Sequence, residues 1–431
     1  MKDEMKLFLK FRAKRKELLL LVISTFIALL LAELVAPVIY KVSMGKDFSK
    51  QEIQRKISAG AGDDVVLDET FIQTKFSQLH PYTGFSAKPN RDTGVNKYGF
   101  AGLEPVNKRS DNRVIIALTG GSVALQSFLF SSDTLISELK RSPVFAGKEI
   151  MLISIAGGGF KQPQPLMALN YFLVLGAEFD VLINLDGFNE VALPPSENIP
   201  VKVHSTYPRF WNLYFRQALD RENSLQIAKM EEIREEQREL RRWYLAHSIL
   251  YQSKLALMLW DIMNNRLEHK LYLENQKFSH LLAQKKATYG PYEPHASLLE
   301  LNAELARTWK LASIQMANLC RGNDIAYFHF LHPNQYFKES KELTDEEKRT
   351  AYIEGENPLK AGVQSGYPLL LEHGKELEER GINFTDLTMI FKAEKRTVYV
   401  DTCCHFNKLG TDSIVREIAG KVVEYYVNYR D

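Results

Sequence analysis

The sequence predicts an α/β protein with a parallel sheet, preceded by an apolar helix long enough to cross a membrane. Three observations predict this class. Short apolar runs each end in turn residues, helical stretches separate these runs, and one long apolar segment follows a basic amino terminus. Strands with few polar positions are typical of parallel sheets that helices cover on both faces. The 431 residues have room for one large domain with an insertion, or for two average domains.

The composition excludes several classes of protein. With 45% hydrophobic residues, 25% charged residues and three cysteines, the chain is neither disordered, collagen-like nor held together by many disulfides. The net charge of +2 gives no general reason to expect nucleic acid as a partner. Residues 1–16 carry seven Lys and Arg against Asp3 and Glu4, a net charge of +5, so the remaining residues sum to −3. The basic character therefore belongs to the amino terminus.

The apolar segment at 18–40 is interrupted by one ionisable residue, Glu33. At about 1.5 Å per residue, a helix of this length covers a hydrocarbon core of roughly 30 Å. The sequence around Glu33 does not resemble a signal-peptide cleavage site, so we expect an uncleaved signal anchor rather than a cleaved leader or a buried core helix. The positive-inside rule then leaves residues 1–17 in the cytoplasm and exports everything after Lys41, to the periplasm or the cell exterior. Glu33 lies near the outer end, where a carboxylate reaches the headgroups, and it need not have a function.

Residues 41–75 are mixed and polar and suit a stalk or the first helix of a folded domain; we expect the stalk, and the pattern of strand, turn and helix places a domain at 76–431. The expected strands, in order, are 114–118, 150–155, 181–185 and 325–331, with a weaker fifth at 382–387. The interval between the third and fourth strands is too long for one crossover. It is rich in Glu, Arg, Leu and Gln, with apolar positions at helical spacing, and predicts a helical insert at about 213–320 that acts as a lid or a partner surface.

Polar or glycine-rich blocks follow the first three strands. Ser122, after Gly120 and Gly121, stands where a strand turns into a helix, and the helix amino terminus there favours developing negative charge on a nucleophile. A serine that only caps the helix, or a loop that binds phosphate, has the same sequence pattern. Three glycines at 157–159 let a ligand approach the backbone, or form only a tight turn. Asn189, after the third strand, points an amide toward the same sheet edge or caps the next helix.

A fourth block lies near the carboxyl terminus, where His405 precedes the last predicted helix and Asp401 stands slightly upstream. A histidine whose ring a carboxylate orients acts as a general base, although a lone loop histidine is usually structural. The four blocks in this order favour the general base over a structural histidine, because one pocket then contains a nucleophile, two oxyanion donors and a base.

With these blocks, the sequence resembles the SGNH (GDSL-like) hydrolase superfamily, and in its upstream HPYTGFSAKPN and VNKYGFAG segments the membrane-anchored bacterial branch. The resemblance runs from about His80 to the end, outside the insert. It implies a three-layer α/β/α fold with a flavodoxin-like parallel sheet. It also implies a catalytic set of Ser122, His405 and Asp401. The implied oxyanion donors are Ser122, Gly159 (with Gly158 as the fallback) and Asn189.

Two positions depart from the family pattern. The family places its aspartate three residues before the histidine, whereas Thr402 stands there and Asp401 lies four before; a Ser-His dyad is the alternative. Gly121 stands where the family often has aspartate. The resemblance implies an extracytoplasmic serine esterase acting on acyl, most plausibly O-acetyl, groups of an envelope glycan, or an acyltransferase on the same site. The alternative from another class is an inactive envelope protein that uses the fold for binding or assembly.

The remaining candidates are weaker. His332, at the end of the fourth strand, is either a substrate contact or, more readily, a structural histidine. Cys320, Cys403 and Cys404 form an odd set, in which Cys320 bridges either of the others or all three are small buried residues. We expect no metal, because adjacent cysteines share a metal poorly and no second ligand pair is visible, and we expect no cofactor.

Overall fold

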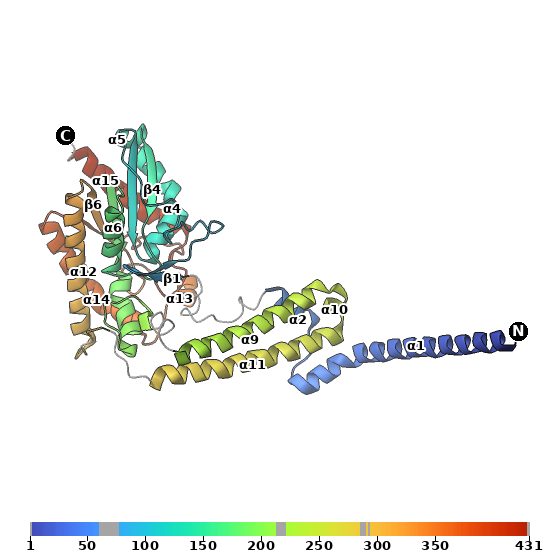
Figure 1. Ribbon diagram of the computed structural model, residues 1–431. Helices are drawn as coiled ribbons and strands as arrows, with labels where there is room; N and C mark the ends of the chain where they lie inside the picture. Colours follow the sequence, from blue (N-terminus) through green and yellow to red (C-terminus); the bar gives the residue numbers. More distant parts are fainter. Residues whose placement is uncertain (1, 60–76, 213–220, 285–289, 292–293, 429–431) are drawn as a thin grey trace. The chain divides into compact units, whose positions relative to one another are not determined.

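The structure is a computed structural model that describes residues 2–59, 77–212, 221–284, 290–291 and 294–428. It divides into two compact units, one formed by Met1–Ile72 with Arg216–Lys286 and the other by Gln73–Phe215 with Ala287–Asp431. The first is helical in its described part, and the second contains the sheet (Figure 1). We call them the helical unit and the α/β unit.

The α/β unit is built on a parallel sheet, as the apolar runs predict. Its strands are β3 (Arg113–Gly120), β4 (Glu149–Ser154), β5 (Val181–Asp186), β6 (Ala326–Leu331) and β7 (Asn383–Asp386). They lie in the order β4-β3-β5-β6-β7, and each pairs in parallel with its neighbour. In chain order this is 2-1-3-4-5, the flavodoxin-like order, in which ligands bind beyond the carboxyl ends of the strands where the order reverses. That point lies at the end of β3.

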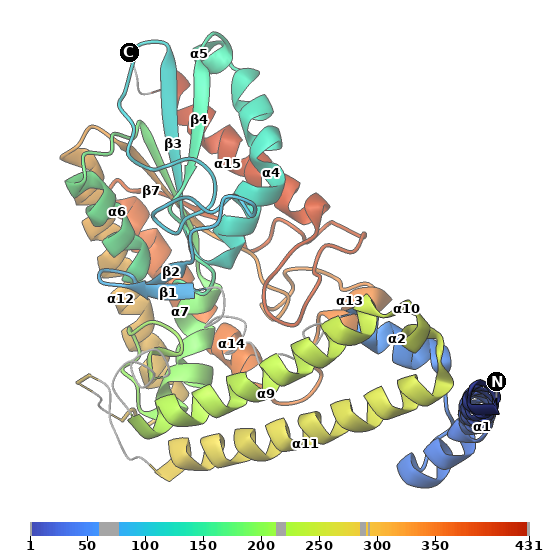
Figure 2. The same cartoon turned by 45° about the vertical axis from the view of Figure 1, so that its right-hand side comes forward.

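Helices cover both faces of this sheet (Figure 2). The elements with their bounds are α4 (Ser122–Lys140), α5 (Pro143–Ala146), α6 (Gln164–Val174), α7 (Phe188–Leu193), η1 (Pro194–Asn198), η2 (Ile199–Val201), α12 (Leu298–Arg321), α13 (Asp345–Thr350), α14 (Pro358–Glu379) and α15 (Lys408–Asn428). Helices α4 and α15 pack together on one face, and α6, α12 and α14 cover the other. A small antiparallel hairpin, β1 (Ser77–His80) and β2 (Gly84–Ala87), precedes the sheet.

Helix α12 lies inside the range 213–320 over which the sequence predicts an insert, yet it packs in the α/β unit. Ser297 caps it by accepting a hydrogen bond from the Glu300 N–H, and its apolar face buries Leu305, Trp309 and Met316. It is the crossover helix between β5 and β6. The predicted range thus includes helices that the structure assigns to two different units. The sequence does not separate them because both groups of helices have the same amphipathic composition.

The helical unit contains the rest of that range together with the amino-terminal helix. Its helices are α1 (Lys2–Met44), α2 (Lys50–Ala59), α9 (Arg221–Ala246), α10 (Ser248–Gln252) and α11 (Lys254–Gln284). They share a small core in which Ala36 and Tyr40 of α1 pack near Ile57, Leu257 and Trp260. Within α1, Leu19–Met44 is long and apolar enough to cross a membrane. Of the predicted stalk at 41–75, α2 packs in this core, and residues 60–75 lie outside the described residues.

Candidate active site

Ser122 begins α4 at the carboxyl end of β3. Gly120, with φ +130°, makes the sharp turn, and a Cβ at that position would lie 2.1 Å from the Leu185 carbonyl oxygen. Gly121 then serves as the N-cap, so the first N–H groups of α4 lack partners within the helix and point into the site. The Ser122 hydroxyl lies 2.8 Å from His405 Nε2. The structure therefore brings the predicted nucleophile and the predicted base into hydrogen-bond contact.

Asp401 and His405 lie on a loop that an antiparallel bridge between Tyr399 and Phe406 closes. The Asp401 carboxylate uses both oxygens: Oδ2 accepts from His405 Nδ1, and Oδ1 accepts from the N–H groups of Cys403 and His405, at 3.0 and 3.2 Å. Burial would raise the pKa of Asp401, but these hydrogen bonds outweigh it and hold the pKa below its ordinary value. With the proton of neutral His405 on Nδ1, Nε2 is free to accept from the Ser122 hydroxyl, the arrangement that a general base requires.

The loop after β6 holds the segment in which Asp401 lies four residues before His405. Asn334 Nδ2 donates to the Cys403 carbonyl at 3.0 Å, and Gln335 Nε2 to the Asp401 carbonyl at 3.0 Å. The Tyr336 hydroxyl donates to the Thr402 carbonyl at 2.7 Å. Three consecutive side chains thus hold the backbone of the loop, and the Asp401 carboxylate reaches the His405 ring from four residues upstream.

Asn189 stands on α7, which begins at the carboxyl end of β5. Its Nδ2 donates to the Phe160 carbonyl at 2.7 Å, and a Cβ on Gly121 would lie 2.3 Å from the same nitrogen. The amide therefore lies directly beside the backbone that carries Ser122. This contact leaves no room for a side chain at Gly121, since a Cβ there would displace Asn189.

The glycine block after β4 places Gly159 on the same side of the site. Gly159 has φ +76°, and a Cβ there would lie 2.2 Å from Cδ of Arg209, so glycine is required by both backbone conformation and space. Within the described residues, its N–H makes no hydrogen bond. Gly159 as the backbone oxyanion donor, with Gly158 as the fallback, stays a prediction.

Behind the site lies a buried polar network that the sequence analysis missed. Asp186 accepts hydrogen bonds from His329 Nε2 at 2.8 Å and from Trp309 Nε1 at 2.6 Å. The carboxylate of Glu190 accepts from the N–H groups of Gly187 and Gln162, at 2.9 and 3.1 Å, and so ties the start of α7 to the glycine block. Gly187 has no side chain with which to form a capping box, so only the contact from Glu190 to the Gly187 N–H is made, and the sequence carries no capping signal that could have identified Glu190.

Lys161 is a further buried residue near the site, and no local signal in the sequence marks it. Its ammonium group is buried and donates to the carbonyls of Ser205, at 2.8 Å, and Tyr207. Burial lowers the pKa of Lys161 to about 7. The residue joins the glycine block to the segment that carries Arg209.

Glu190 predicts a pH dependence of stability. Burial and the nearby charge of Asp186 raise its pKa from 4.5 to about 8. A raised pKa in the folded state stabilises the protein below the ordinary value, and this stabilisation is lost as pH rises from there through about 8. We expect Glu190→Gln to lower the melting temperature of the full chain less at about pH 9 than at about pH 5. A difference in melting temperature between the two proteins that stays the same across this pH range would contradict this assignment.

His332 lies away from solvent. Its Nδ1 is 2.9 Å from the Pro333 carbonyl, its Nε2 accepts from the Phe188 N–H at 3.4 Å, and burial lowers its pKa to about 4. Both ring nitrogens are therefore engaged within the protein. This arrangement fits the structural alternative, and we do not include His332 among the groups that face a substrate.

The cysteines are free thiols, and Cys320 is buried in α12. Sγ of Cys403 lies 3.1 Å from Sγ of Cys404, and these two with His405 offer three possible metal-ligand atoms within 4.8 Å of one another. Both nitrogens of His405 already hold Ser122 and Asp401, so a metal there would break the hydrogen-bonded set. Burial raises the pKa of the Cys404 thiol, which keeps it protonated beside Ser122.

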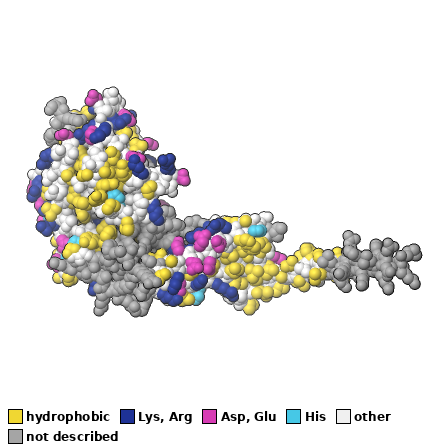
Figure 3. Space-filling model, in the orientation of Figure 1, with side chains coloured by type: hydrophobic (Ala, Val, Ile, Leu, Met, Phe, Trp, Pro, Cys, Tyr) yellow, Lys and Arg dark blue, Asp and Glu magenta, His cyan; other side chains and the backbone are white. Residues whose placement is uncertain are grey.

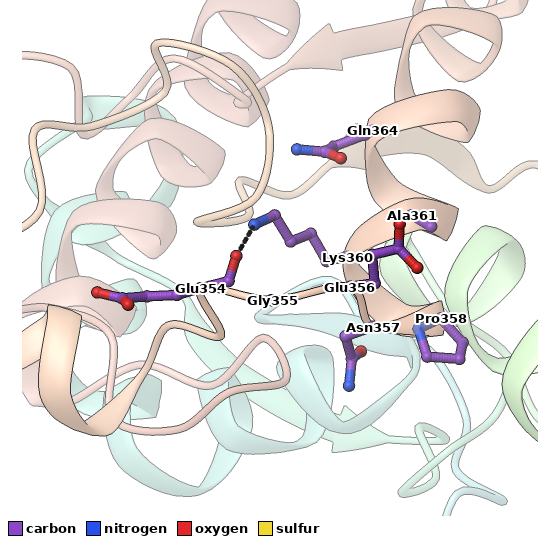
Figure 4. Close-up of a pocket in the computed structure, with 8 residues that line it drawn as sticks. All are labelled: Glu354, Gly355, Glu356, Asn357, Pro358, Lys360, Ala361 and Gln364. Carbon is purple, nitrogen blue, oxygen red and sulfur yellow. Dashed lines mark hydrogen bonds between the residues drawn. The ribbon is translucent and has the colours of Figure 1, made fainter.

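Two hollows lie on the α/β unit. One, of about 810 Å³, lies at the start of α14, where Lys360 Nζ donates to the Glu354 carbonyl at 3.2 Å (Figure 4). None of the predicted site residues lines it. The other, of about 560 Å³, is lined by Tyr82, Tyr207 and Trp211 and by the start of α6. None of the predicted site residues lines this aromatic hollow either.

Comparisons with known proteins add little to this geometry. No protein-family model matches the sequence, and no curated protein matches it. Among solved structures, that of an acetyl xylan esterase, AlAXEase, is similar over 72% of this chain and 98% of its own, with 10% sequence identity and a TM-score of 0.32. A similarity of this size supports no argument about function, which therefore depends on the site itself.

Proposed function

We propose that the protein is a membrane-anchored serine esterase of the SGNH type. The observation that carries this proposal is the continuous hydrogen-bonded set from Ser122 Oγ through His405 to the Asp401 carboxylate. A binding or assembly protein has no need of this set, and chance alignment of three such groups at a helix amino terminus is improbable. The first test is hydrolysis of a chromogenic acetyl ester by the purified full chain in detergent; absence of turnover would favour the binding protein.

The proposed reaction has two steps. His405 Nε2 takes the proton of the Ser122 hydroxyl as Oγ attacks the ester carbonyl carbon, and the charged ring is stabilised by Asp401. The tetrahedral intermediate collapses, His405 returns the proton to the leaving alcohol oxygen, and an acyl-serine remains. Water, activated by His405, then attacks the acyl carbon and releases the acid and free Ser122. If a sugar hydroxyl replaces water, the same site transfers the acyl group.

The negative charge that develops on the carbonyl oxygen must be stabilised by hydrogen-bond donors. The N–H of Ser122 at the start of α4, the N–H of Gly159 and the amide of Asn189 supply them in this proposal. Asn189 uses one amide hydrogen to bind the Phe160 carbonyl, which orients the group and leaves the second hydrogen for the oxyanion.

Removal of the amide donor tests this assignment. We expect Asn189→Ala to lower kcat by about 10²-fold or more while KM changes little, because the donor acts mainly on the transition state. Steady-state kinetics on the chromogenic ester measure both constants, and thermal unfolding checks that loss of the contact with Phe160 leaves the fold intact. An unchanged kcat would remove Asn189 from the oxyanion site.

The proposed location follows from α1. Residues 1–17 are basic and the helix beyond them is long and apolar, so the chain is expected to be anchored once, with its carboxyl-terminal unit outside the cytoplasm. A reporter fused after Asp431 that is active only when exported would show this orientation. Reporter activity in the cytoplasm would reverse it.

The proposed substrate is an O-acetylated glycan of the envelope or cell exterior. Aromatic side chains such as Tyr82 and Trp211 offer flat apolar faces on which sugar rings pack, and they line a hollow of the α/β unit. Release of acetate from acetylated polysaccharides, compared with release from the small chromogenic ester, tests this class. A higher kcat/KM for the polysaccharide supports it, and activity confined to the small ester argues against it.

A further inference from the structure

Glu33 lies inside the apolar segment of α1, and its carboxylate accepts hydrogen bonds from another helix. It accepts hydrogen bonds from the Lys254 N–H at 2.8 Å, from the Leu255 N–H at 3.4 Å, and from the Ser253 hydroxyl. These groups form the amino-terminal end of α11, whose first N–H groups have no partners within the helix. Glu33 therefore caps α11 from another helix, where the helix dipole favours a negative charge.

A second contact fixes the direction of the two helices. The Tyr40 hydroxyl donates to Asp261 Oδ2 at 2.5 Å. Tyr40 lies seven residues after Glu33, and Asp261 lies seven residues after Lys254, so the first two turns of α11 run parallel to α1 and in register with it. Ala36 and Leu257, halfway along, are both fully buried.

This register places the start of α11 at a definite depth along α1. From Leu19, where the apolar segment begins, to Glu33 the helix rises about 21 Å, and a bilayer has a hydrocarbon core of roughly 30 Å. If α1 spans the membrane, Glu33 lies in the outer third of the span. The start of α11, which Glu33 caps, must then lie at the same depth.

The surface around this point is apolar. Leu259 and Met263, one turn apart on α11, are 45% and 47% exposed, and Trp243 near the end of α9 is 52% exposed. On α1, Val38 and Val42 are also exposed. Figure 3 shows hydrophobic side chains continuing from α1 onto the end of the helical unit near α10, whereas charged side chains gather farther along α9 and α11.

We propose that the end of the helical unit formed by residues 243–263 is a membrane-binding surface seated in the outer leaflet of the bilayer that α1 crosses. The inference rests on the proposed anchoring by α1. Trp243 is then a headgroup-level anchor of the kind that tryptophan provides at membrane interfaces, Leu259, level with Val38 in this register, meets the acyl chains, and Met263, level with Val42, lies among the headgroups. The long side chain of Lys254 reaches outward to lipid phosphates. The contact with Glu33 therefore fixes the start of α11 at a set depth in the outer leaflet.

Tryptophan fluorescence in nanodiscs tests the proposal. The full chain is reconstituted into discs of phosphatidylethanolamine and phosphatidylglycerol, with ordinary or brominated acyl chains, and compared with Trp243→Phe. Subtracting the two proteins isolates the emission of Trp243 from that of the other three tryptophans. We expect the Trp243 emission to lose intensity in brominated discs. Equal intensity in both kinds of disc would overturn the proposal.

A matched control moves the reporter along α11. In the double variant Trp243→Phe/Tyr272→Trp, the new ring stands at an exposed site about 27 Å along the helix from Lys254, and its emission is expected to be insensitive to bromine. Equal quenching at both sites would mean that the whole helical unit lies on the bilayer, which contradicts the proposed seating. If the chain does not enter discs at all, the anchoring fails instead; a chain that enters discs with Trp243 unquenched refutes only this inference.

Discussion

Ser122→Ala is expected to abolish ester hydrolysis, with a fall in kcat of about 10⁴-fold or more. The reason is that no other described hydroxyl touches His405 Nε2, so the acyl intermediate has no acceptor. The melting temperature should change little, because the Ser122 side chain is only partly buried and begins a helix rather than filling the core. Turnover of the chromogenic acetyl ester, with wild-type and variant at matched concentrations, measures the loss.

Ser137→Ala is the matched control for this change. Ser137 lies on the same helix, is exposed, and donates only to the Thr134 carbonyl, so wild-type activity is expected. Activity that survives Ser122→Ala would identify a different nucleophile. The nearby Cys404 is the first alternative to examine, although burial keeps its thiol protonated.

Asp401→Asn is expected to lower kcat by up to about 10⁴-fold with little change in stability. The asparagine Oδ1 can still accept the N–H groups of Cys403 and His405, so the loop keeps its shape. Its Nδ2 then faces the ring and forces the proton of His405 onto Nε2, where it blocks acceptance from Ser122. Steady-state kinetics and thermal unfolding together separate this tautomer effect from a folding defect.

Thr402→Val is the matched control for the aspartate. Thr402 occupies the position three before His405, where the resemblance would place the carboxylate, but its carbonyl is the group that Tyr336 holds. We expect activity close to wild type. Wild-type activity in Asp401→Asn would instead support a Ser-His dyad, and loss of activity in Thr402→Val would show that the loop depends on this side chain.

Much of the α/β unit could be predicted because its strands are apolar on both faces. Val114–Leu118 and Val181–Leu185 have no polar residue on either face except Asn184, a pattern that buried parallel strands require. The same pattern cannot distinguish a sheet-covering helix from an inserted one. Leu305 and Trp309 of α12 recur at helical spacing just as Met230 and Ile233 of α9 do, and only tertiary contacts separate them.

The site residues that the sequence could nominate are those that directly follow strands. Ser122 and Asn189 do so, and parallel strands bring their ends together. Residues that hold the site in place carry no such signal. Lys161 is recognisable only once its ammonium is seen among backbone carbonyls, and Glu33 caps a helix more than two hundred residues away in the chain. Partnerships of this kind depend on the folded arrangement and leave no local pattern.

The most direct measurement of the central claim is the identity of the acylated residue. The full chain is mixed with a chromogenic acetyl ester, quenched with acid during turnover, digested and analysed by mass spectrometry. The account predicts an acetyl group on the peptide that carries Ser122, at its hydroxyl, and none on that peptide in Ser122→Ala. An acetyl group on another residue, together with undiminished turnover in Ser122→Ala, would contradict it.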